Sequence, residues 1–115
     1  MTEGFREAGE RFKPTDIDGL VERRGNFLFI ETKKPGAELP TGQRIALERL
    51  VDLADSRDLP GSALVTLHGP KDTPERMQWR YQRRWAPAEA CDRRVAIDWI
   101  RSWFLRASEP ENRRI

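Results

Sequence analysis

The sequence predicts a mixed α/β (α+β) fold in which helices flank a β-sheet. Three observations support this prediction. Residues 16–33 are typical of two strands joined by a tight turn, residues 42–57 repeat apolar side chains at helical spacing, and residues 62–68 form a short apolar run. The predicted order is roughly helix, strand, strand, helix, strand, followed by an extra strand and a C-terminal helix.

The first elements are a short helix and a hairpin. Residues 3–12 are polar apart from two phenylalanines, and Pro14 is placed to end a helix there. Residues 16–22 and 26–33 are rich in Ile, Val, Leu and Phe, and Arg24-Gly25-Asn26 lies between them. This composition and spacing indicate a β-hairpin.

A loop rich in proline and glycine follows the hairpin, and Thr41 is placed to cap a helix over residues 42–57. The run at residues 62–68 is apolar on both faces, which predicts a central strand. The apolar side of the predicted helix consists of Leu47, Leu50, Val51 and Ala54.

Residues 77–85 alternate in character, which predicts a further strand or extended arm. Pro87 is placed to start a final helix that extends to about Ala107. One face of the strand carries Met77, Trp79, Tyr81 and Trp85, and one side of the helix carries Ala96, Trp99, Ile100, Trp103 and Phe104.

Length and composition predict one domain over residues 1–108 and a disordered tail over residues 109–115. Charged residues make up 35% of the 115-residue chain, yet the apolar 37% fall in periodic blocks, as in compact proteins. Cys91 is the single cysteine, and neither a membrane span nor a signal-peptide pattern is present. These features indicate a soluble protein in a reducing cytoplasm.

The charge is unevenly distributed, although the net charge is only +2. Residues 76–115 hold 10 arginines and 5 acids, whereas residues 1–75 carry a net charge of −3. An acidic motif beside a basic surface suits a site that binds a divalent cation and attracts polyanions.

The hairpin strands carry acids and a lysine where apolar residues are expected. If Arg24 and Gly25 are the two turn residues, Asp18 stands opposite Glu31; if Gly25 and Asn26 turn the chain, Asp18 faces Lys33. Either register gathers Asp18, Glu31 and Lys33 on one face within roughly 5–8 Å.

Two carboxylates at this separation repel each other unless a cation lies between them. Mg²⁺ prefers carboxylate and carbonyl oxygens together with several waters, so Asp18, Glu31 and the Thr32 carbonyl form a candidate metal site. A bound ion would activate water and polarise a phosphoryl oxygen, and Lys33 would stabilise the transition-state charge. The alternative is a surface hairpin with exposed ion pairs, each contributing at most about 1 kcal/mol.

The segments PTDIDG and IETKK, the loop after them and the helix start Thr41-Gly42-Gln43 resemble the PD-(D/E)XK nuclease superfamily. The resemblance is in particular to small phage and bacterial members like those of the VRR-NUC and Holliday-junction-resolvase groups. The resemblance spans residues 14–68 and implies a restriction-endonuclease-like mixed sheet. It also implies an Mg²⁺-dependent deoxyribonuclease, with Mn²⁺ as a substitute, acting on branched or replication and recombination intermediates.

Within this resemblance, Asp18 matches the first acid, Glu31 and Lys33 match the (D/E)XK pair, and Gln43 matches the glutamine that contacts metal-bound water or phosphate. Gln43 shares the helical phase of the apolar side, so it faces the sheet and needs a polar partner; a second cap or a satisfied buried amide is the alternative. Members of the family usually add a glutamate from the first helix, for which either Glu7 or Glu10 is available.

Some assignments stay open. Asp16 competes with Asp18 as the first metal ligand because it stands nearer to Pro14, although one residue separates the two and the strict Pro-Asp dipeptide is not present. His68 is more simply structural than a general base, because no serine or cysteine nucleophile accompanies it.

The nucleic-acid contacts assigned from the sequence are Lys34, Arg80 and Arg84, with the alternating aromatics packed inward. DNA is therefore the expected partner, and a homodimer is common among resolvase-like nucleases. The alternative function is a non-catalytic nucleic-acid- or protein-binding module that retains the nuclease fold, such as a phage regulatory protein.

Overall fold

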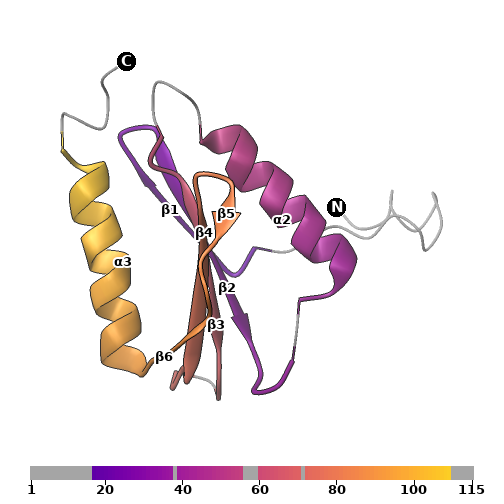
Figure 1. The fold of residues 1–115 in the computed structure, drawn as a ribbon. Coiled ribbons are helices and arrows are strands. Elements are labelled where there is room, and N and C mark those ends of the chain that lie inside the picture. The colour runs from indigo at the N-terminus through magenta and orange to yellow at the C-terminus, as the bar shows by residue number, and fades with distance from the viewer. Residues whose placement is uncertain (1–16, 38, 56–59, 71, 110–115) are drawn as a thin grey trace, which may run out of the picture.

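The computed structural model describes residues 17–109 except 38, 56–59 and 71. The predicted N-terminal helix, with Glu7 and Glu10, and Asp16 lie outside these residues. In the described part of the chain, six strands form one mixed sheet, with helix α2 on one face and helix α3 on the other (Figure 1). The predicted mixed α/β fold is thus confirmed.

Strands β1 (Gly19–Arg23) and β2 (Asn26–Lys33) form the predicted hairpin. Arg24 and Gly25 are the turn residues, with φ angles of 55° and 87°, as a type I′ turn requires. Gly19 pairs with Ile30, so the first of the two predicted registers is the observed one. Strand β2 has the predicted bounds, whereas β1 begins three residues later than predicted.

Helix α2 (Thr41–Ala54) connects β2 to the parallel strand β3 (Ala63–His68). Strand β3 lies between β2 and β4 and is buried over its first four residues, so the prediction of a central strand is confirmed. The prediction that Thr41 caps α2 is wrong: Pro40 occupies the N-cap position, and among the described residues no side chain caps the helix. Thr41 is already the first helical residue.

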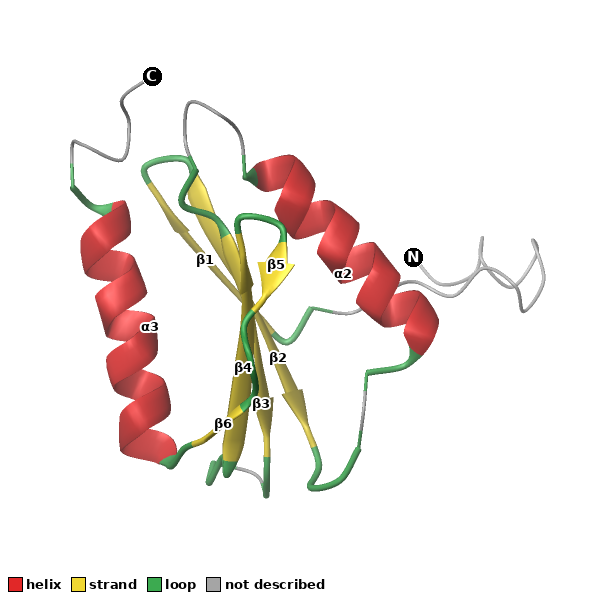
Figure 2. Ribbon diagram, viewed as in Figure 1, coloured by secondary structure: helices red, strands yellow, loops and turns green. Residues whose placement is uncertain are grey.

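The predicted strand over residues 77–85 is in fact two strands, β4 (Arg76–Tyr81) and β5 (Arg84–Trp85) (Figure 2). Gln82 and Arg83 reverse the chain with φ angles of 51° and 65°. The alternation holds along β4, but the reversal places Trp85 in the cluster on the opposite face from Trp79 and Tyr81.

The C-terminal helix also begins later than predicted. Residues Glu89–Ala90 form the short strand β6, which pairs with β4, and α3 then spans Arg93–Ala107. Its N-cap is Asp92, whose carboxylate accepts a hydrogen bond from the Val95 N–H. The prediction that Pro87 starts the helix is wrong, because the backbone after Pro87 pairs with the sheet.

Two hydrophobic clusters hold the layers together. The first lies between the sheet and α3, and the second lies between the sheet and α2. Successive residues of a strand project to opposite faces, so Leu28 belongs to the first cluster and Phe29 to the second. The buried members are Leu28, Ala63, Val65, Met77, Trp103 and Ala107 in the first cluster, and Phe29, Leu47, Val51 and Leu64 in the second.

Gly61 lies where the hairpin turn and α3 approach each other closely. A Cβ atom there would stand 2.5 Å from Oδ1 of the fully buried Asn26, and the Gly61 carbonyl accepts a 2.7 Å hydrogen bond from Trp103 Nε1. We expect Gly61→Ala to lower the free energy of unfolding by about 1–3 kcal/mol, because Asn26 must move. The measurement is urea denaturation followed by circular dichroism.

Gly42→Ala is the matched control for this prediction. Apart from its chain neighbours and the backbone of its own helix, no described atom lies within 4 Å of the position of its Cβ, and the residue stands in the first turn of α2. Alanine there should raise stability by up to about 1 kcal/mol, because glycine loses more backbone entropy in a helix. Equal effects of the two substitutions would contradict the assigned close packing at Gly61.

Candidate functional site

The candidate site lies at the carboxyl end of β2, on the sheet face that α2 covers. Phe29 belongs to the α2-side cluster, and Glu31 and Lys33 follow at intervals of two on the same face. Gln43 reaches them from the first turn of α2. Residues 34–40 separate the strand from the helix in the sequence, so the site combines residues from both ends of one connection.

Gln43 bridges the acid and the lysine. Its Nε2 donates to Glu31 Oε2 at 3.0 Å, and its Oε1 accepts from Lys33 Nζ at 3.1 Å. The opposite amide orientation would set the carbonyl against the carboxylate and the NH₂ group against the ammonium. The two charges therefore fix the orientation of the amide.

Glu31 is a deeply buried acid with an exposed fraction of 1%. An isolated carboxylate at such a position costs several kcal/mol, so it requires donors or a cation. Its Oε1 accepts from the Asp18 backbone N–H at 3.2 Å, and its Oε2 accepts from Gln43. Charge-assisted hydrogen bonds of this kind reduce the cost of burial.

Asp18 stands next to Glu31, but its carboxylate is oriented differently from the prediction. Its Oδ2 accepts from the Thr32 backbone N–H at 2.8 Å and from Thr32 Oγ1 at 3.0 Å. Asp18 lies just beyond the last paired residue of β1, so its side chain turns to the edge of β2 instead of joining the face of Glu31 and Lys33. The strand register places Asp18 near Glu31. The orientation of the Asp18 carboxylate differs from the prediction because Asp18 lies beyond the paired residues of β1.

The candidate ligands are all oxygens, which is the donor type that a hard divalent cation takes. In a strand, the N–H and C=O of one residue point to the same side, so the Thr32 carbonyl points to the edge where Asp18 lies. Two carboxylates and one carbonyl suit Mg²⁺, which keeps several waters. Among the described residues, no group of three or more His, Cys, Asp or Glu side chains could hold a metal, so the protein would supply few ligands.

The residues assigned to nucleic acid lie in different surroundings. Lys34 and Arg84 are exposed, whereas Arg80 forms a bidentate ion pair with Asp52 of α2 at 2.8 and 3.0 Å. The hydrogen bonds to Asp52 raise the pKa of Arg80. Arg80 thus contacts α2, because this helix covers the face of β4 that the alternation predicted to be polar.

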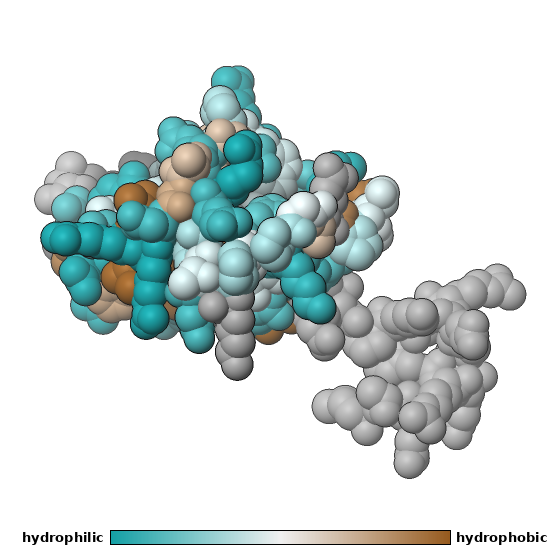
Figure 3. Space-filling view, turned by 90° about the horizontal axis from the view of Figure 1, so that it is seen from below, coloured by the Kyte–Doolittle hydropathy of each residue, from teal (hydrophilic) through white to brown (hydrophobic). Residues whose placement is uncertain are grey.

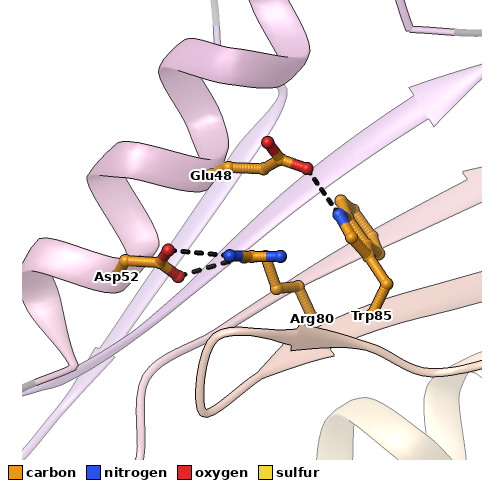
Figure 4. A network of polar contacts seen from close by, with 4 residues as sticks. All are labelled: Glu48, Asp52, Arg80 and Trp85. Atoms are coloured by element: carbon orange, nitrogen blue, oxygen red, sulfur yellow. Dashed lines mark hydrogen bonds and ion pairs between the residues drawn. The ribbon is translucent and has the colours of Figure 1, made fainter.

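A second contact joins α2 to the same hairpin (Figure 4). Trp85 Nε1 donates to Glu48 Oε2 at 2.6 Å, one helical turn before Asp52. We call these four residues, Glu48, Asp52, Arg80 and Trp85, the α2 clamp. It fixes the later turns of α2 on β4 and β5, while Gln43 fixes the first turn on β2.

The ion pair in the α2 clamp should contribute measurably to stability. The Arg80 and Asp52 side chains are 15% and 26% exposed, so solvent screens them only in part. A double-mutant cycle with Arg80→Ala and Asp52→Ala is expected to give a coupling energy of about 1–2 kcal/mol in urea denaturation. The pair Asp98 and Arg101, at 4.0 Å and largely exposed, is the control, and an equal coupling there would refute the prediction.

The strand register brings further polar residues to the site that the sequence analysis did not assign to it. Glu31 pairs with Thr66 and Lys33 pairs with His68 in the neighbouring strand β3. His68 in turn pairs with Arg76 of β4. The parallel pairing of β2 with β3 creates this row, and a single sequence contains no local signal for such a register.

Comparison of the chain with family models, with curated proteins and with solved structures gives no match. In the part of the chain that the structure describes, no helix is both long and apolar enough to cross a membrane.

Proposed function

We propose that this protein is an Mg²⁺-dependent endonuclease of the PD-(D/E)XK type that hydrolyses DNA phosphodiester bonds. The observation that carries the proposal is the network Glu31–Gln43–Lys33, which stands beside Asp18 and joins two elements separated by a loop. The sequence pattern alone is common by chance. Four residues that match the motif and also lie close together are much less common by chance.

Each residue has a role in the proposed reaction. Asp18, Glu31 and the Thr32 carbonyl would hold Mg²⁺, or Mn²⁺ in its place. When bound, the ion supplies a more acidic water and polarises a phosphoryl oxygen. Lys33 places a positive charge beside the phosphate that is attacked, and Gln43 holds the Lys33 ammonium and the Glu31 carboxylate in register.

Helix α2 adds an electrostatic contribution. Its N-terminal turn carries Gln43, and no side chain in the described part of the chain caps that turn. The N-terminus of a helix presents backbone N–H groups and a partial positive charge, which favour a phosphate. The first turn of α2 thus carries the bridging amide of Gln43 and also favours the binding of an anion.

The test is cleavage of linear, flapped and four-way DNA with Mg²⁺, with Mn²⁺ and with EDTA. We expect metal-dependent cutting by the wild type and loss of cutting in Lys33→Ala and Glu31→Ala. Glu89→Ala removes an exposed carboxylate from β6 and should leave cutting unchanged. Persistent cutting by both site variants, or none by the wild type on any substrate, would refute the proposal. DNA binding without cutting would indicate the non-catalytic module.

A further inference from the structure

A row of basic side chains crosses three strands at the end of the sheet that holds the candidate site. Lys33 of β2 pairs with His68 of β3, and His68 pairs with Arg76 of β4. We infer that Lys33, His68 and Arg76 form a track that binds the sugar-phosphate backbone of a nucleic-acid strand. This inference rests on the proposed function, because it assigns the direction in which the substrate leaves the site.

The three side chains lie on the same face of the sheet. Register partners in neighbouring strands project to the same side, and Lys33 contacts Gln43 of α2. Two further contacts locate that face independently. Leu64, four residues before His68, packs in the α2-side cluster, and Arg80, four residues after Arg76, pairs with Asp52 of α2.

Helix α2 leaves the distal part of this row uncovered. Its first turn contacts β2 through Gln43, and its later turns contact β4 and β5 through the α2 clamp, near the other end of the sheet (Figure 1). Arg76 is exposed and His68 is partly exposed. Seen from the end where β2 and β3 finish, the surface is mostly hydrophilic (Figure 3).

The charges along the track suit a polyanion. Ala90 of β6 pairs with Arg76 and adds only a methyl group, whereas the exposed acid Glu89 pairs with Met77 and thus projects to the α3 side. Among the residues of β2, β3 and β4 that project to this face, the acid is Glu31, which is buried and hydrogen bonded, whereas Asp72 and Glu75 are exposed in the loop between His68 and Arg76. Three strands about 4.8 Å apart span roughly 10 Å. A nucleic-acid strand carries about one phosphate per 3.4 Å of axis, so two or three phosphates fit.

The experiment measures the binding of fluorescein-labelled single- and double-stranded DNA by fluorescence anisotropy, in EDTA, at several salt concentrations. Arg76→Ala should weaken binding roughly fivefold to tenfold at low salt and lower the slope of log K against log salt by about 1. His68→Ala should weaken binding by a smaller factor. Arg76→Lys should restore most of the slope.

Arg94→Ala is the matched control, because Arg94 is an exposed arginine on α3, on the other face of the sheet. Three results would each overturn the track. Arg76→Ala and Arg94→Ala could lose the same amount of DNA affinity, Arg76→Ala could bind DNA as tightly as the wild type, or the wild type could fail to bind DNA. Cleavage separates this inference from the proposed function. If the wild type binds DNA through Arg76 but does not cut it, only the nuclease proposal is refuted. If the wild type cuts DNA but Arg76→Ala binds DNA as tightly as the wild type does, only the track is refuted.

Discussion

Replacing Glu31 by glutamine is expected to abolish cleavage and to remove the stabilisation of the protein by Mg²⁺. The substitution keeps the shape of a side chain that is 1% exposed, but it removes one of two carboxylates that would hold the ion. A cation at about ten times its Kd stabilises a protein by roughly 1.4 kcal/mol. In a domain of this size, that gain raises the Tm by roughly 5 °C.

The measurement is the Tm in MgCl₂ compared with the Tm in EDTA, for the wild type and for Glu31→Gln. Glu89→Gln serves as the control, because Glu89 is an exposed carboxylate in β6. We expect Mg²⁺ to raise the Tm of the wild type and of Glu89→Gln but not that of Glu31→Gln. An equal rise in all three proteins would mean that the ion binds elsewhere.

Replacing Gln43 by glutamate is expected to destabilise the protein without metal and to make its stability strongly dependent on Mg²⁺. The amide now donates to Glu31 at 3.0 Å and accepts from Lys33 at 3.1 Å. Glutamate keeps the acceptor for Lys33 but sets a second carboxylate against a buried one. Two like charges this close cost about 1–3 kcal/mol or more unless one is protonated or a cation intervenes.

Gln43→Ala separates this repulsion from simple loss of the bridge. Alanine removes the donor without adding charge, so its stability should fall by about 1–3 kcal/mol, with no added response to Mg²⁺. Urea denaturation with Mg²⁺ and with EDTA measures both effects. If Mg²⁺ restores Gln43→Glu no more than it stabilises the wild type, the ion does not bind beside Glu31.

Local patterns predicted the central part of the fold and of the site. Composition and the position of the turn gave β2 its bounds, and the helical period of the apolar residues placed Gln43 on the sheet side of α2, where it contacts Glu31. The sequence left two hairpin registers open, and the structure has the one in which Arg24 and Gly25 are the two left-handed residues of a type I′ turn. These features depend on residues close together in the chain.

The errors arose where distant parts of the chain decide the outcome. Gln82 and Arg83 adopt positive φ angles without glycine, so no turn signal marked the end of β4. Residues after Pro87 pair with β4 instead of starting a helix, and the orientation of Asp18 depends on where β1 stops pairing. The row from Lys33 to Arg76 depends on strand pairings, which a single sequence does not encode locally.

Because the α2 clamp holds the later turns of α2, a small rotation of the helix there displaces Gln43 at its other end. Asp52 lies nine residues after Gln43, which is about 13 Å along the helix axis at 1.5 Å per residue. A pivot of about 5° at the clamp would therefore move the Gln43 end by roughly 1 Å, enough to stretch hydrogen bonds of 3.0 and 3.1 Å beyond their useful range. Residues at the far end of the sheet thus set the alignment of the amide that joins Glu31 to Lys33.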